Sequence, residues 1–190
     1  MALTKTPVCD FGKKAEDFKL KSINNRLVSL NDIKGDKATL IMFICNHCPY
    51  VIATIKDIVD TSKKLEQKGI NSVAIMSNDP TDYPEDSFEN MIKFAERYNF
   101  QFPYILDEDQ SVGKKYDAVC TPDFFGYNKN LELQYRGRIY ELNNDVRPRV
   151  RKENSQNDLL NAMIQISETG EGPKDQIPSL GCSIKWKDNH

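Results

Sequence analysis

The sequence contains no apolar segment of membrane-spanning length, and residues 1–7 lack the apolar stretch that a secretory signal carries. It also lacks an excess of basic residues, because 26 Lys and Arg stand against 28 Asp and Glu and give a net charge of −2. A chain without a positive field has no general attraction for nucleic acid or for an anionic bilayer. These absences predict a cytoplasmic protein that binds neither nucleic acid nor a membrane.

Two glycine-rich nucleotide patterns are absent as well. The chain has neither a Walker-type phosphate loop nor a dinucleotide fingerprint. We therefore expect no bound cofactor. Reducing equivalents would have to come from a redox partner, either a protein like thioredoxin or a small thiol like glutathione.

The five cysteines are odd in number and irregularly spaced, which argues against a secreted disulfide scaffold. Two of them, Cys45 and Cys48, lie where the apolar run 38–44 gives way to a helical pattern that starts at Pro49. Cysteines at this spacing can close a small disulfide ring, and the free N–H groups of a helix start favour a thiolate. The segment predicts redox or metal chemistry; the alternative is a pair of small buried hydrophobic residues.

The rest of the 190-residue chain alternates strand and helix patterns without an internal repeat. Residues 38–44 and 70–76 are nearly continuous apolar runs, typical of central strands covered on both faces. Further strand patterns, with two hairpins among them, cover residues 17–23 with 26–30, 103–107, and 124–127 with 133–139. Helical spacing covers residues 49–69, 88–98, 110–118 and 159–166.

Two of these helices carry more specific predictions. Ser155 is the predicted N-cap of the last helix. In the first helix one stripe faces the core, and it consists of Val51, Ile52, Ile55, Ile58, Val59, Ser62 and Leu65. The order of elements predicts an α/β fold with a mixed sheet between helices. We expect residues 1–170 to form one domain and residues 171–190 to form a tail that packs on or near it.

Five segments carry a family resemblance in their order and spacing: 15–20, 43–50, 119–125, 135–139 and 181–186. In sequence they read AEDFKL, FICNHCPY, VCTPDFF, YRGRI and GCSIKW. They resemble the peroxiredoxin-like AhpC/TSA, or redoxin, group of thioredoxin-fold proteins, and the resemblance covers nearly the whole chain. It implies a thioredoxin-like three-layer sandwich, and an enzyme that exchanges thiols and disulfides or acts as an antioxidant.

The peroxide-binding pattern of typical peroxiredoxins, Pro-x-x-x-Thr-x-x-Cys, is not present. Counting back from Cys45 places Ala38 and Met42 at the proline and threonine positions, and counting back from Cys48 places Ile41 and Cys45 there. The threonine hydroxyl that would hold a peroxide is therefore missing. We expect peroxide reduction to be slow.

The pattern of ordinary thioredoxins is not present either. Those proteins have Trp before the first cysteine and Gly-Pro between the two, whereas this chain has Ile44 and then Asn46-His47. The sequence predicts an atypical dithiol centre that belongs to neither standard type.

Cys45 is the expected attacking thiolate because it lies at the tip of the turn, where we expect it to be exposed, with Cys48 one helical turn further in as the resolving thiol. The thioredoxin pattern supports that order. The register with peroxiredoxins reverses it and places Cys48 at the attacking position. His47 could carry a positive charge beside the thiolate and lower its pKa, and it could also transfer the proton of the thiol. The alternative is that His47 is a solvated turn residue.

The pair Thr121-Pro122 is the predicted substrate-binding element, because in the fold that the chain resembles a cis bond before proline opposes the dithiol. Cys120 is either a third redox partner near it or a plain core residue. Cys182, in the tail, is a possible resolving thiol, within its own chain or in a partner chain. Alternatively, the tail is a packed strap held by apolar residues such as Trp186.

A metal carrier is the competing interpretation of the same segment. Cys45, His47 and Cys48 offer the soft ligands that copper or zinc prefers. The only other histidine, His190, is the last residue of the chain. The redox interpretation is preferred, and under it we expect no bound metal.

Overall fold

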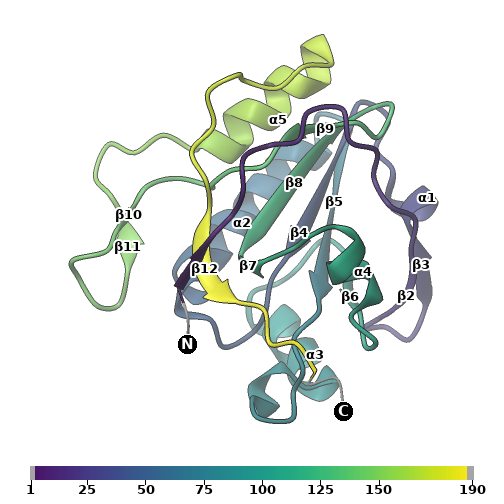
Figure 1. Ribbon diagram of the computed structural model, residues 1–190, viewed down its shortest axis with the longest axis vertical. Coiled ribbons are helices and arrows are strands. Elements are labelled where there is room, and N and C mark those ends of the chain that lie inside the picture. The colour runs from purple at the N-terminus through teal and green to yellow at the C-terminus, as the bar shows by residue number, and fades with distance from the viewer. Residues whose placement is uncertain (1–2, 188–190) are drawn as a thin grey trace.

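The computed structural model, which describes residues 3–187, is built around a seven-stranded mixed sheet (Figure 1). From edge to edge its strands are β3 (Leu27–Ser29), β2 (Lys19–Ser22), β6 (Tyr104–Leu106), β5 (Ile70–Met76), β4 (Ala38–Phe43), β8 (Asp123–Asn128) and β9 (Leu133–Tyr135). Strands β4, β5 and β6 run parallel, and the neighbouring strands pair with them antiparallel. The predicted mixed α/β sheet is confirmed.

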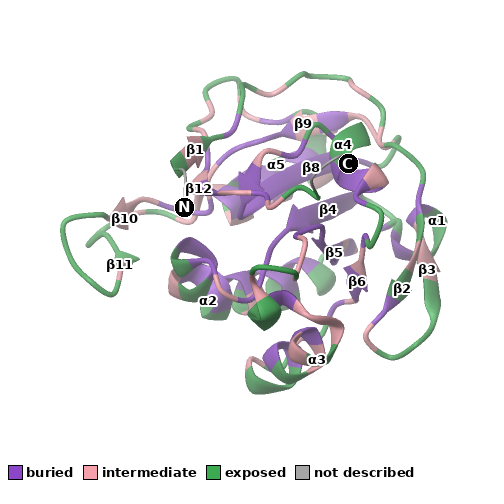
Figure 2. Cartoon of the chain, turned by 60° about the horizontal axis from the view of Figure 1, so that its bottom comes forward, coloured by how far each residue is buried: buried purple, intermediate pink, exposed green. Residues whose placement is uncertain are grey.

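The sheet is covered by helices on both faces. On one face lie α2 (Pro49–Glu66), α3 (Phe88–Arg97) and α5 (Asp158–Thr169), and on the other lie α1 (Leu30–Ile33) and α4 (Ser111–Lys115). Successive side chains of a strand point to opposite faces, so Leu40 and Met42 pack with the first set of helices and Ile41 and Phe43 with the second. Every residue of β4 is buried, as Figure 2 shows for the centre of the sheet.

Helix α2 places the cysteine pair at its start. Cys48 is its N-cap and Pro49 its first residue, which costs no hydrogen bond because the first N–H groups of a helix have no partner within it. The predicted apolar stripe is wrong at one position, Ile52, which is 47% exposed. The buried line of the helix passes beside this residue through Val51 and Ile55.

The predicted N-cap of the last helix is also wrong. Helix α5 begins at Asp158, and the side chain of Asn157 accepts a hydrogen bond from the backbone N–H of Leu160. The Ser155 hydroxyl instead accepts from the backbone N–H of Glu141 at 2.8 Å. Asn157 has an equally good capping side chain and lies next to the first turn.

The tail forms a second, smaller sheet with the beginning of the chain. Strand β12 (Leu180–Ser183) lies between β1 (Leu3–Lys5) and β7 (Cys120–Thr121) and pairs antiparallel with both (Figure 1). Sequence patterns did not predict this sheet, because its strands have two to four residues and come from distant parts of the chain. Two further short strands, β10 (Leu142–Asn143) and β11 (Val150–Arg151), form a hairpin, and a 3-10 helix, η1 (Pro84–Asp86), precedes α3.

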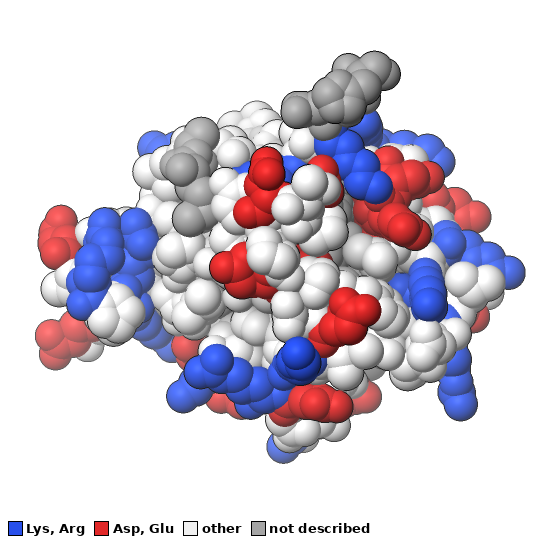
Figure 3. Space-filling model, turned by 90° about the horizontal axis from the view of Figure 1, so that it is seen from below, with Lys and Arg blue, Asp and Glu red and all other residues white. Residues whose placement is uncertain are grey.

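Figure 3 shows Lys and Arg side chains mixed with Asp and Glu on the face seen from below, in keeping with the net charge of −2. Within residues 3–187, none of the helices is both long enough and apolar enough to cross a bilayer.

A buried ion pair anchors the start of β8. The guanidinium of Arg136 donates to both carboxylate oxygens of Asp123 at 2.9 and 3.2 Å, and it also bonds the backbone oxygen of Asp117 at 2.7 Å. Asp123 has no exposed surface, and Arg136 is 6% exposed. Because Asp123 follows Pro122 directly, this ion pair fixes the loop that faces the cysteines.

We expect Asp123→Asn to lower the free energy of unfolding by about 3 kcal/mol, because it leaves a buried guanidinium without its charge partner. The matched control is Asp117→Asn, which removes an ion pair with Lys13 from a carboxylate that is 68% exposed. That change should cost less than about 1 kcal/mol. Urea unfolding of both variants measures the difference, and equal losses would contradict the anchoring role of Asp123.

Candidate functional site

The site lies where the carboxyl end of β4 meets the loop before β8. The register of these two antiparallel strands pairs Phe43 with Asp123. The residues just after Phe43 therefore face the residues just before Asp123, which brings Cys45 to Thr121. The Thr121–Pro122 peptide bond is cis, as the family resemblance implied.

Thr121 contacts both cysteines of the pair. Its hydroxyl oxygen lies 3.2 Å from the Sγ of Cys45, and its backbone oxygen accepts a hydrogen bond from the Cys48 thiol at 3.1 Å. One residue thus meets both thiols through different groups. The structure brings together Cys45, Cys48, Thr121 and Pro122, as the sequence predicted.

Both thiols are fully buried. Cys45 and Cys48 retain 0% exposure. The expectation that Cys45 is exposed at the tip of the turn is therefore wrong. The next residue, Asn46, is itself buried by hydrogen bonds with Glu85 and Tyr104, and these bonds draw the turn into the protein.

Hydrogen-bond donors around Cys48 favour its thiolate. The thiols of Cys182 and Cys45 and the backbone N–H groups of Val51 and Cys182 all act on this sulfur, and together they hold the pKa of Cys48 well below its ordinary value despite burial. The Thr121 oxygen opposes them, because it binds the protonated thiol. The four donors outweigh the one acceptor, so the net shift of the Cys48 pKa is downward.

Cys45 has the opposite character. Burial, the hydrogen bond that it makes with Cys48, and the negative charge of Asp86 raise the pKa of Cys45 well above its ordinary value. The pKa values of the two cysteines are therefore shifted in opposite directions. This polarity agrees with the order of roles that the peroxiredoxin register gave and disagrees with the order drawn from exposure.

His47 is held between a carboxylate and an aromatic ring. Its Nδ1 lies 2.7 Å from the Oδ2 of Asp86, and its ring stacks on Tyr83 with centroids 4.6 Å apart. The hydrogen bond to Asp86 raises the pKa of His47, although burial opposes the shift. Its side chain is only 10% exposed, so it is not a solvated turn residue, and its Nε2 has no partner among the described residues.

Asp86 is the site residue that sequence analysis missed. It is 1% exposed and accepts hydrogen bonds from the backbone N–H of Asn46 and the side chain of Asn78, in addition to His47. One feature of the sequence could have indicated Asp86, namely its place in a polar loop that follows a predicted strand. The polar loop that begins at Ser77 follows β5, and β5 is the parallel neighbour of β4, so both strands end at the same edge of the sheet.

The other two candidate cysteines have different surroundings. Cys120 is fully buried, its pKa is raised by burial, and its thiol donates to the Pro122 oxygen at 3.7 Å. Cys182 pairs with Thr121 across the β12–β7 ladder, and its side chain lowers the pKa of Cys48. Among the described residues, Cys182 is therefore the cysteine that the structure adds to the pair, while Cys120 makes no hydrogen bond to either thiol.

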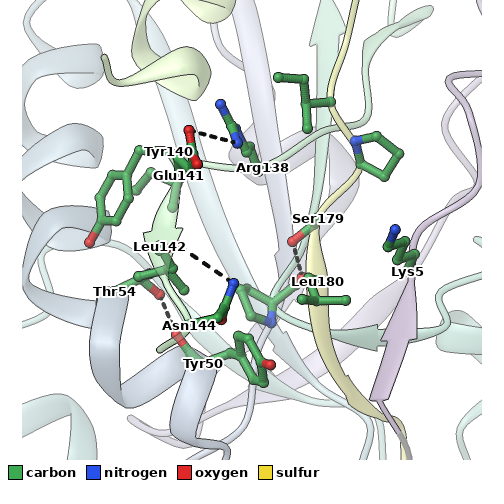
Figure 4. Close-up of a pocket in the computed structure, with 14 residues that line it drawn as sticks. Lys5, Tyr50, Thr54, Arg138, Tyr140, Glu141, Leu142, Asn144, Ser179 and Leu180 are labelled. Atoms are coloured by element: carbon green, nitrogen blue, oxygen red, sulfur yellow. Dashed lines mark hydrogen bonds and ion pairs between the residues drawn. The ribbon is translucent and has the colours of Figure 1, made fainter. Parts of the chain in front are cut away.

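A cavity of about 250 Å³ lies between the start of α2, the cis-proline loop and the tail (Figure 4). Tyr50 and Thr54 of α2 line it together with Pro122 and the tail residues Ser179 and Leu180. It therefore touches the first turn of the helix, the cis-proline loop and β12 at once. A small molecule or a peptide side chain could rest there, next to the cis-proline loop.

Three residues of the site have the donor atoms of a metal ligand set. One ligand atom each of Cys45, His47 and Asp86 lie within 4.8 Å of one another. The hydrogen bond that Nδ1 of His47 donates to the Asp86 carboxylate leaves Nε2 as the free ligand atom of His47, which is how carboxylates commonly orient metal-binding histidines. The set fits zinc or copper by its chemistry.

The fold and the buried cysteine pair define a thioredoxin-fold thiol protein. The model of the AhpC/TSA family matches residues 11–141. The chain therefore belongs to the AhpC/TSA family. A curated relative, thiol-disulfide oxidoreductase ResA of Bacillus thuringiensis, is 24% identical over 127 residues, which are 67% of this chain and 69% of the relative.

Two solved structures are similar over nearly the whole chain. An uncharacterized conserved protein from Geobacillus kaustophilus is 41% identical, with a TM-score of 0.88 and coverage of 100% of this chain and 99% of that one. A hypothetical protein from Sinorhizobium meliloti is 33% identical, with a TM-score of 0.86 and coverage of 97% and 98%. The similarity thus includes the tail, which lies outside the family match.

We expect the thiolate absorbance of Cys48 to persist as the pH falls below 9, the ordinary pKa of a thiol, and to disappear only at the depressed pKa of the folded state. Cys182→Ala should raise the midpoint, because it removes the largest cause of the depression. Cys120→Ala is the control and should leave the midpoint unchanged. Ultraviolet titration of the folded protein measures it, and an unshifted midpoint in the first variant would exclude the role of Cys182.

Proposed function

We propose that the protein is a thiol–disulfide oxidoreductase whose Cys45 and Cys48 alternate between a dithiol and a disulfide. The observation that carries the proposal is the cysteine pair at Thr121, whose hydroxyl lies 3.2 Å from the Cys45 Sγ and whose backbone oxygen accepts from the Cys48 thiol at 3.1 Å. The lowered pKa of Cys48 and the raised pKa of Cys45 give the two thiols different roles. The Cys48 thiolate attacks a substrate disulfide and forms a mixed disulfide. Cys45 then attacks Cys48, so that one disulfide breaks in the substrate and one forms in the protein.

His47 and Asp86 would handle the proton of that second step. Cys45 has to lose its proton to become a nucleophile, and its raised pKa makes this the demanding event. The His47–Asp86 pair lies beside it, within the 4.8 Å cluster. We assign the pair as the proton acceptor for Cys45.

The substrates would be protein or small-thiol redox partners, of the thioredoxin or glutathione kind. The mixed surface charge offers no strong electrostatic selection (Figure 3). Recognition would instead use the Thr121 backbone and the adjacent cavity lined by Tyr50 and Pro122. We propose the cytoplasm as the compartment, where such thiols are kept reduced.

Slow peroxide reduction is a secondary activity of the same site. A peroxide needs a thiolate and a hydroxyl that holds it. The Thr121 hydroxyl supplies one in place of the missing threonine of the peroxiredoxin pattern, but it lies beside Cys45 and not beside the Cys48 thiolate. We therefore expect antioxidant activity well below that of a typical peroxiredoxin.

Cys48→Ser should lower the rate of insulin disulfide reduction by at least about 100-fold, because the attacking thiolate is gone. Cys45→Ser should lower it less, since the first step remains. Cys120→Ser is the matched control, a buried cysteine of the adjoining strand, and should keep the rate. In stopped-flow reactions with hydrogen peroxide, the unmodified chain should react about as fast as a free thiolate. Full activity of Cys48→Ser in both assays would disprove the proposal.

A metal carrier is the second candidate function, and the cluster of Cys45, His47 and Asp86 favours it. The carrier would bind copper or zinc through Cys45, His47 and Cys48, with Asp86 orienting the imidazole or adding an oxygen ligand. We place it second because Cys48 bonds the Thr121 oxygen and has Cys182 as a donor, contacts that a metal would have to replace.

Metal analysis of protein purified without a tag separates the two functions. The redox proposal predicts well under one metal ion per chain, and His47→Gln should then leave the metal content unchanged. A stoichiometric content that falls in His47→Gln would support the carrier. The control variant is His190→Gln, which removes the only other histidine.

A further inference from the structure

Strand β12 occupies the position at which an extended substrate would meet the cysteine pair. A chain that pairs with the β7 edge places its residue opposite Thr121 close to the thiols, because paired residues lie side by side across a ladder. In this structure the residue opposite Thr121 is Cys182. The protein thus presents a cysteine of its own at the place of a substrate cysteine.

The approach of the tail to this edge is unusually close at Gly181. A Cβ atom added there would lie 2.1 Å from the backbone oxygen of Thr121, so a residue with a side chain does not fit. The absence of a side chain lets β12 sit directly on the cis-proline loop. The position of Cys182 is therefore fixed by backbone contacts on both sides, with β7 and with β1.

The contacts of the sulfur atoms distinguish Cys182 from the other cysteines. Cys182 pairs with Thr121, whose backbone oxygen accepts from the Cys48 thiol, and the side chains of Cys182 and Cys45 both lower the pKa of Cys48, from β12 and from the turn after β4. Cys120 lies next to Thr121 in sequence, yet its thiol donates to the Pro122 oxygen. Two thiols, and not one, are thus positioned to attack a disulfide on Cys48.

We propose that Cys182 is a third redox thiol, which resolves a mixed disulfide on Cys48 in competition with Cys45. The proposal rests on the proposed function. The Cys182 sulfur attacks the Sγ of Cys48, a Cys48–Cys182 bond forms, and the bond from Cys48 to the substrate sulfur breaks. The proton of Cys182 goes to the departing substrate thiolate, and the electrons balance as one disulfide exchanged for another.

Burial gives this step a place in the reaction cycle. Cys45 and Cys48 have no exposed surface, so β12 has to leave Thr121 before a substrate disulfide reaches Cys48. When β12 returns, it brings Cys182 back onto Cys48. The return of the tail and the release of the substrate are then the same event.

A test uses one equivalent of the aromatic disulfide dithiobis(nitrobenzoate) per chain, in a Cys9→Ser/Cys120→Ser parent that retains only the three cysteines in question. After Cys45→Ser in this parent, we expect both halves of the reagent to be released and a Cys48–Cys182 bond in peptide maps of the monomer. After Cys45→Ser/Cys182→Ser, one half of the reagent should stay on Cys48. The release of this second half should be at least about 100-fold slower than in the Cys45→Ser chain, because the double variant lacks the internal thiol of Cys182, which acts at a high effective concentration.

Gly181→Val in the Cys45→Ser parent is the matched control, since it keeps the Cys182 thiol and displaces the strand that carries it. We expect it to retain the adduct on Cys48, and circular dichroism checks its fold. Release as fast as in the Cys45→Ser chain would overturn the proposal. So would an adduct in the Cys45→Ser chain as stable as in the double variant, or a bond between two chains.

The same data separate this inference from the proposed function. If Cys48 forms the adduct and only Cys45 can resolve it, the inference fails and the oxidoreductase remains. If no reagent reacts at Cys48 in any of the chains, the proposed function itself fails.

Discussion

The groups of Thr121 determine how the whole site is arranged. Its hydroxyl meets Cys45, its oxygen meets Cys48, and its backbone pairs with Cys182. Thr121 is held in place from two directions, by the β4–β8 register that leads to Pro122 and by the buried Asp123–Arg136 pair just beyond it. A peptide unit has little freedom once both its neighbours are fixed. The main sheet therefore determines the position of Thr121, and through it the positions of the groups that contact the two thiols.

Burial and charge act on the two thiols in opposite ways. Burial is the largest cause of the raised pKa values of Cys45 and Cys120, and it outweighs the hydrogen bond between Cys45 and the Thr121 hydroxyl. The pKa of Cys48 is lowered instead, because groups at the start of α2 and in the tail act on its sulfur as donors. The contrast within one small volume gives each thiol a distinct chemical character, which two identical residues at the same spacing in an unfolded chain would not have.

The sequence was sufficient for the main sheet, its main helices and the position of the cysteine pair at a helix start, because these depend on local periodicity and on one short motif. It was insufficient for Asp86, which lies 39 residues from its partner His47 and has no local pattern of its own. It misplaced the cap of α5, since Ser155 and Asn157 are both good caps and the choice depends on a contact with Glu141. The predicted exposure of Cys45 was also wrong, because the burial of the turn depends on a hydrogen bond between Asn46 and Tyr104, which are distant in the sequence.

Strand β12 is a central strand of its small sheet, because β1 pairs with its outer edge. Separating the tail from β7 therefore disturbs a second ladder that includes the first described residues of the chain. Such an opening is a local unfolding equilibrium and not a hinge motion of a loop. The free energy of that equilibrium, shared between the two ends of the chain, would set how often the dithiol is accessible, whatever the intrinsic reactivity of its sulfur atoms.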